Sequence, residues 1–262
     1  MTIKNLWVSF VISMLILIPM KVMVSFSLLP YISEQIFTIF GVVWLAVVII
    51  LGIIFKPNQK NVSVKKNNYL ALSSLVVCVA FFGCIAAYFN DQSKYDFAWQ
   101  PFMMSFLSIL SCVSFVLFSA TFFTGKNILN KASFFLYCPV LWFSLYMLIF
   151  MSIYTSDVDV FEVISAALLA LFFIYYTQVF STSSNANIFK LVYLTGIPAI
   201  ISCTISCMPS VIKILQHQEI SSVVSATTYL QLAIALHILI TLIDFNKQYE
   251  KNNIPVIKSI SI

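Results

Sequence analysis

Eight long apolar runs follow one another along this 262-residue sequence. A helix needs about 20 apolar residues to cross the hydrocarbon core of a bilayer. An unpaired backbone group in lipid costs several kcal/mol, so each run is expected to form an α-helix. The sequence therefore predicts an all-α, polytopic transmembrane helix bundle of about eight spanning helices. The expected spans are approximately residues 6–28, 35–55, 69–89, 100–123, 132–154, 160–181, 189–212 and 225–245.

The composition agrees with residence in a bilayer. Hydrophobic residues make up 61% of the chain and charged residues 9%, and the mean hydropathy is +1.00. Ordinary soluble domains are about 45–50% apolar and about 25% charged. The longest predicted inter-helix loop, residues 56–68, and the tail after residue 245 are too short for a second folded domain. We therefore expect a single membrane-embedded domain over residues 1–262, and we interpret the first apolar run as a retained helix.

The lysines predict an orientation, because cytoplasmic loops are enriched in basic residues. All 14 basic residues are lysines. Lys94 and Lys213 fall on one side of the predicted topology, and Lys21 lies inside the first span. The other side carries Lys4, Lys56, Lys60, Lys65, Lys66, Lys126, Lys131, Lys190, Lys247, Lys251 and Lys258. We expect this second side to be cytoplasmic, with both termini on it. The predicted location is the cell membrane, as a multi-pass protein of the bacterial cytoplasmic membrane.

Four residues form a candidate intramembrane polar site. An ionisable residue inside a span is a functional hypothesis by default. His237, Thr241 and Asp244 share one face of the last span, because they are spaced i, i+4, i+7. Such a line could relay protons or bind a cation, although a solvated Asp244 and one interhelical hydrogen bond to His237 would also explain it. Lys21 follows Pro19 and could line a polar pocket; the alternative is that its long side chain extends outward to the interface.

The seventh span contains Gly196, Pro198 and Pro209. Discontinuous helices with free backbone groups form substrate sites in many transporters, so these residues suggest a broken helix. The same span has serines at 202, 206 and 210, a spacing that lets a neighbouring helix approach closely. Both interpretations remain open from the sequence.

Other polar residues have simpler explanations. The stretch from Asp159 to Glu162 has the spacing of a capping box at the start of the sixth span. The six cysteines all fall in apolar runs and are expected to pack like small hydrophobic residues. We find no HExxH or GxSxG motif and no pair of aspartates in adjacent spans, so an intramembrane enzyme has no supporting pattern. No cofactor and no metal site are predicted, and the scattered lysines do not indicate nucleic-acid binding.

The stretch FFLYCPVLWFSLYMLIF, within residues 132–154, is similar to uncharacterised multi-spanning membrane proteins of low-GC Gram-positive bacteria. The segment from Pro139 to Trp142 carries most of this resemblance. The group has no assigned activity, so the resemblance implies a membrane location and no site residue. The use of lysine without arginine and the abundance of isoleucine, phenylalanine and asparagine are typical of an AT-rich genome, which agrees with this resemblance.

Two functions are compatible with these patterns. The first is a transport-type role, as a permease, carrier or membrane subunit for a small solute or lipid. The second is a non-catalytic assembly, anchoring or regulatory subunit of a larger membrane complex. The expected partners are the lipid bilayer and, in either role, another membrane subunit or a separate ATPase, because the chain has no nucleotide-binding domain of its own.

Overall fold

A computed structural model describes residues 3–28, 32–54, 65–91, 99–129, 132–153, 159–181, 186–218 and 220–253. Within these ranges the regular structure is entirely helical. Seven of the helices are long and apolar enough to cross a membrane, so the chain is a multi-pass α-helical membrane protein, as the sequence predicts. The helices are α1 (Ile3–Ser25), α2 (Glu34–Ile54), α3 (Asn68–Asn90), α4 (Trp99–Thr124), η3 (Ser133–Tyr137), α5 (Cys138–Ile153), α6 (Val160–Ser181), α7 (Ala186–Leu215) and α8 (Ser222–Asn253).

The fifth predicted span is a shorter apolar helix than the other seven and contains two kinds of helix. Its α-helical part, α5, has 16 residues and is about 24 Å long, less than the roughly 30 Å of a hydrocarbon core. The five-residue 3₁₀ helix η3 leads directly into it and adds about 10 Å. Pro139 explains the junction, because proline fits the first turn of an α-helix but not its interior. The carbonyl of Phe135, four residues before Pro139, accepts hydrogen bonds from the backbone N–H of Cys138 and from the Ser114 hydroxyl of α4.

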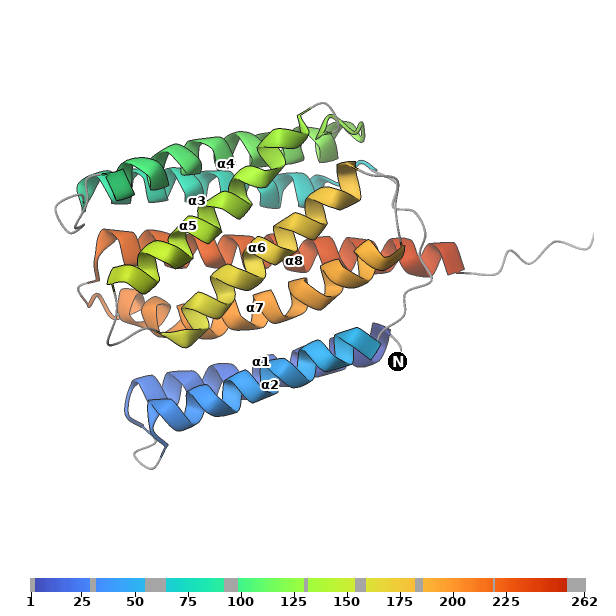
Figure 1. Cartoon of the computed structure of the whole chain (residues 1–262). Helices are drawn as coiled ribbons and strands as arrows, with labels where there is room; N and C mark the ends of the chain where they lie inside the picture. Colours follow the sequence, from blue (N-terminus) through green and yellow to red (C-terminus); the bar gives the residue numbers. More distant parts are fainter. Residues whose placement is uncertain are drawn as a thin grey trace, which may run out of the picture.

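Six of the helices form a closed circuit. Each of α3 to α8 packs against the next along the chain, and α8 packs back against α3. The α1–α2 hairpin lies outside this circuit as a separate layer, in contact with α7 (Figure 1). The chain therefore consists of a six-helix core and an attached two-helix hairpin.

Both helices of the hairpin contact α7, and α2 does so along a narrow seam. Its buried residues are Phe37, Gly41, Leu45, Val48 and Gly52, which recur at helical spacing. A Cβ atom added at Gly41 would lie 2.3 Å from Cζ of Phe161 in α6, and one added at Gly52 would lie 2.8 Å from Cδ1 of Leu194 in α7. Glycine is therefore required for the backbone of α2 to approach the core this closely.

Charged residues separate to the two ends of the bundle, as expected if successive helices cross in opposite directions. We call them the acidic end and the lysine-rich end. The acidic end carries Glu34, Asp91, Asp159 and Glu162, together with Lys21 and Lys213, and the lysine-rich end carries Lys65, Lys66, Lys126, Lys190 and Lys247. Helix α1 starts and α8 finishes at the lysine-rich end (Figure 1). Among the charges used to predict orientation, Lys56, Lys60, Lys94, Lys131 and Lys258 lie outside the described residues.

Of the two interpretations of the seventh span, the structure favours close packing over a broken helix. Helix α7 is continuous from Ala186 to Leu215, with Pro198 and Pro209 inside it. Spans tolerate proline because neighbouring helices and hydroxyl side chains satisfy the freed backbone groups. Gly196 serves close packing instead, since an added Cβ would lie 3.2 Å from both Ile238 of α8 and Phe172 of α6.

Candidate functional site

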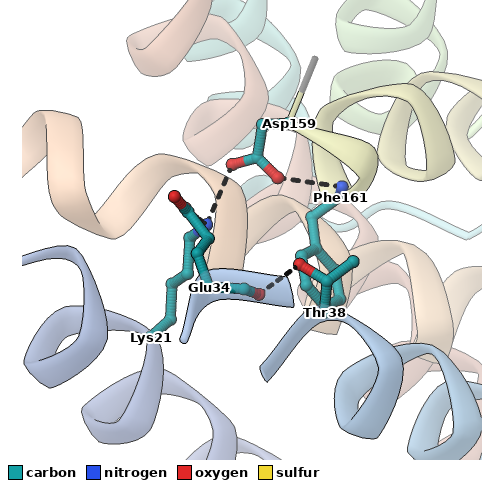
Figure 2. Close-up of polar contacts among 5 residues, drawn as sticks. All are labelled: Lys21, Glu34, Thr38, Asp159 and Phe161. Carbon is teal, nitrogen blue, oxygen red and sulfur yellow. Dashed lines mark hydrogen bonds and ion pairs between the residues drawn. The ribbon is translucent and has the colours of Figure 1, made fainter. Parts of the chain in front are cut away.

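A buried lysine at the acidic end joins three helices. The Lys21 side chain of α1 is only 3% exposed, and its Nζ atom lies 2.9 Å from Oε1 of Glu34 and 3.3 Å from Oδ2 of Asp159 (Figure 2). Glu34 is the first residue of α2, and Asp159 precedes the first residue of α6. We call these three residues the Lys21 cluster. The Lys21 side chain reaches the acidic end of the bundle, but its ammonium is covered by protein and held by two carboxylates.

Local structure positions the acids of this cluster. Oδ1 of Asp159 accepts a hydrogen bond from the backbone N–H of Phe161, at 3.0 Å. This is the N-cap half of the predicted capping box, and it leaves Oδ2 for Lys21. The Lys21 ammonium also lies 5.9 Å from the ring centroids of Phe37 and Phe161, within the range of a cation–π interaction. The cluster therefore attaches the hairpin to the core at the acidic end.

The second acid of the capping box has a different partner. The Glu162 side chain turns inward and accepts a hydrogen bond from the Tyr146 hydroxyl of α5. Tyr146 in turn stacks on Trp142 one turn earlier, with ring centroids 5.2 Å apart and an interplanar angle of 9°. A carboxylate at the acidic end is thus linked to an aromatic side chain in the interior of the core.

His237 lies inside the six-helix core and is completely buried. Its Nδ1 atom is 2.9 Å from the Ser73 hydroxyl of α3. Phe115, Phe118 and Tyr176 pack around the imidazole, with ring centroids 5.7, 6.4 and 5.9 Å away. A charged imidazolium would be poorly solvated in such a setting.

The second ring nitrogen of His237 has no hydrogen-bond partner among the described residues. Ser73 has one hydroxyl proton, and Leu70 O competes for it at 3.0 Å. If Ser73 donates to Leu70, Nδ1–H donates to Ser73 and Nε2 is a free acceptor; otherwise Nε2–H is a free donor. In either tautomer the imidazole keeps one unused polar atom within the core. An unsatisfied buried polar atom of this kind is uncommon in native proteins and calls for an explanation.

Thr241 and Asp244 continue from His237 toward the lysine-rich end of α8. The Thr241 hydroxyl donates to the carbonyl oxygen of His237 at 2.8 Å. Asp244 accepts two side-chain hydrogen bonds, one from Nδ2 of Asn67 and one from Nε2 of Gln248, both at 2.8 Å. Asn67 also caps α3. The three sequence-predicted residues of α8 therefore do lie on one inward-facing line.

Lys21 is not part of that line. It belongs to the acidic end, whereas His237, Thr241 and Asp244 lead toward the lysine-rich end, so the four residues form two separate sites. Sequence reasoning missed the partners Ser73, Tyr176 and Asn67, because a hydroxyl or amide near a span boundary carries no signal of its own.

Among the described residues, no group of three histidine, cysteine, aspartate or glutamate side chains could hold a metal ion. Comparison of the chain with protein-family models, with curated proteins and with solved structures finds no match. The geometry of the two polar sites is therefore the basis for a functional proposal.

Proposed function

We propose that this chain is a transport-type protein of the bacterial cytoplasmic membrane. In this proposal it is a permease, carrier or membrane subunit for a small solute or lipid, with eight spans and both termini in the cytoplasm. One observation carries the proposal: a closed circuit of six helices surrounds a fully buried histidine that keeps an unused polar atom. Polar groups inside a span are costly and in general mark substrate or ion pathways.

The direction of the pathway follows from α8. From His237, polar side chains lead past Thr241 to Asp244, which is partly exposed at the lysine-rich end. A solute or ion entering at this end would meet the Asp244 carboxylate first and the imidazole last. Loss of the imidazole should therefore impair movement through the core more than any change on the outer surface of α8.

Flux through the purified chain tests the proposal. Proteoliposomes would be challenged with gradients of protons, Na⁺, K⁺, glycerol and alanine, and compared with protein-free vesicles. We expect at least one probe to move in the wild type and His237→Ala to reduce its rate by about tenfold, the loss equivalent to one hydrogen bond of about 1.4 kcal/mol. The matched control is Leu236→Ala, because its neighbouring side chain is 48% exposed and faces away from the core.

A second function, as an assembly or anchoring subunit, is favoured by a groove on the outer surface. It lies between α3 and α8, has a volume of about 490 Å³ and includes Ala80, Gly83, Ala226 and Ala233. A Cβ added at Gly83 would meet nothing within 4 Å, and small side chains allow another span to pack closely. Stoichiometric co-purification of a second membrane protein, lost on Gly83→Leu, together with no flux for any probe, would favour this function instead.

A further inference from the structure

Five aromatic side chains inside the core contact one another in a closed ring. We call them the aromatic layer. The four phenylalanines are fully buried and Trp142 is 1% exposed. Successive ring centroids are 5.8 Å apart for Phe81–Phe115, 5.7 Å for Phe115–Phe173, 6.2 Å for Phe173–Phe143, 4.9 Å for Phe143–Trp142 and 5.5 Å for Trp142–Phe81.

The layer draws its side chains from four of the six core helices. Phe81 comes from α3, Phe115 from α4, Phe143 and Trp142 from α5, and Phe173 from α6. The one polar atom of these side chains, Nε1 of Trp142, donates to the Ser108 hydroxyl of α4 at 2.7 Å. The layer therefore offers no free hydrogen-bonding group to water, and the indole orientation is held by α4.

The layer contacts the Tyr146–Glu162 pair and the His237 site through different rings. Trp142 stacks on Tyr146, whose hydroxyl donates to Glu162 at the acidic end. Phe115 makes an edge contact with His237, with centroids 5.7 Å apart and an interplanar angle of 83°. The aromatic layer thus lies between the Tyr146–Glu162 pair and the His237 site.

We infer that the aromatic layer is the permeability barrier of the core and separates a polar half-pathway at the acidic end from one at the lysine-rich end. This inference rests on the proposed transport function. Apolar constrictions stop ions and water by dewetting, without any need for complete steric closure. A solute would reach Glu162 from one end and His237 from the other, and would pass between them only when the rings separate.

Two neighbouring phenylalanines of α3 provide the test. Phe81 belongs to the layer and is fully buried, whereas Phe82 is 58% exposed on the outer surface. Proteoliposomes would contain a pH-sensitive dye, and a K⁺ diffusion potential set with valinomycin would drive protons inward. Phe81→Ala opens space beside four other rings, so we expect its proton leak to exceed that of Phe82→Ala by at least about tenfold. Phe82→Ala should match the wild type.

Phe81→Leu retains most of the apolar volume and provides a second variant if Phe81→Ala is not recovered as a monodisperse protein. It should leak less than Phe81→Ala and more than Phe82→Ala. Folded Phe81 variants whose vesicles are as tight as those of Phe82→Ala would overturn the inference, even if the wild type transports a solute. Leaky Phe81 variants in a protein that moves no solute would support the barrier and count against the transport function.

Discussion

The Lys21 cluster predicts a non-additive response to removal of its two carboxylates. The proposed substitutions are Glu34→Gln, Asp159→Asn, the double variant, and a triple variant that adds Lys21→Met. Asparagine at 159 is chosen because it preserves the N-cap hydrogen bond to α6. Each single substitution leaves the ammonium with one carboxylate, whereas the double variant leaves it buried with neither of them.

The exposures of the three side chains set the expected magnitudes. Glu34 is 68% exposed and Asp159 is 29% exposed, but Lys21 is only 3% exposed. Solvent therefore screens the acids, and each single substitution should lower the free energy of unfolding by about 1 kcal/mol or less. The double variant should lose about 3–5 kcal/mol, the usual effect of stranding a buried charge. The triple variant should recover most of this loss, because methionine replaces the buried charge with an apolar side chain of similar length.

The native cysteines provide the assay. All six are buried, so a thiol-reactive fluorescent dye reports unfolding of the detergent-solubilised protein during a temperature ramp. The expected order of apparent midpoints is wild type, then the triple variant and the single variants, then the double variant well below all of them. Two results would refute the proposed role of the two carboxylates. One is a drop in the midpoint of the double variant that does not exceed the sum of the drops in the two single variants. The other is a triple variant with a midpoint as low as that of the double variant.

Three further predictions concern packing, topology and the Asp244 site. Gly41→Ala should lower the free energy of unfolding by about 1–3 kcal/mol through overpacking against α6. In the same thermal melt, Gly83→Ala should not lower the midpoint, because its side chain faces open space and alanine is a better helix former than glycine. In intact cells, a cysteine placed at Gln218 should react with an impermeant thiol reagent, and one placed at Lys126 should be shielded. Both positions are exposed and lie at opposite ends of the bundle. The reverse labelling would contradict the predicted orientation. Asp244→Ala should cost about 1–3 kcal/mol, because two side-chain amides lose their acceptor, and an unchanged melting midpoint would contradict that role.

Helix positions were largely predictable because a backbone that crosses lipid must satisfy its own hydrogen bonds and therefore forms a helix. The second and sixth spans were expected at 35–55 and 160–181, and the helices are Glu34–Ile54 and Val160–Ser181. The last helix continues to Asn253, beyond the apolar run that ended near residue 245. That extension is polar, and hydropathy detects only the part of a helix that lies in hydrocarbon.

Helix packing was not predictable, because core and lipid-facing surfaces are both apolar. Phe81 and Phe82 are adjacent and chemically identical, yet one is fully buried and the other is 58% exposed. In a soluble helix the outward side chain would be polar and the pattern would reveal the buried face. Without that contrast, the sequence could not show that five aromatic residues from four helices meet, nor that Lys21 points toward Asp159.

Side-chain hydrogen bonds divide the buried polar residues into two groups: those bonded within their own helix and those bonded to another helix. Many buried hydroxyls, including those of Ser74 and Thr204, donate to a carbonyl of their own helix, which satisfies them without involving a neighbour. Thr241 belongs to this group, so its place in the candidate site is weaker than the spacing suggested.

Hydrogen bonds that cross between helices are fewer, and two of the residues that make them also keep an unpartnered atom. His237 is bonded to Ser73 and retains Nε2, and Gln231 accepts from Cys207 at 3.0 Å and retains Nε2 of its amide. Both are buried on α8, six residues or about 9 Å apart, with Gln231 nearer the acidic end. Buried side chains of other helices, including Gln100, Ser105 and Ser111 of α4, also keep unpartnered polar atoms, so this feature is not confined to α8; a pathway through the core requires groups of this kind that can bind and release. Substitutions at His237 and Gln231 therefore discriminate between transport and assembly more sharply than changes at the small and hydroxyl residues of α7.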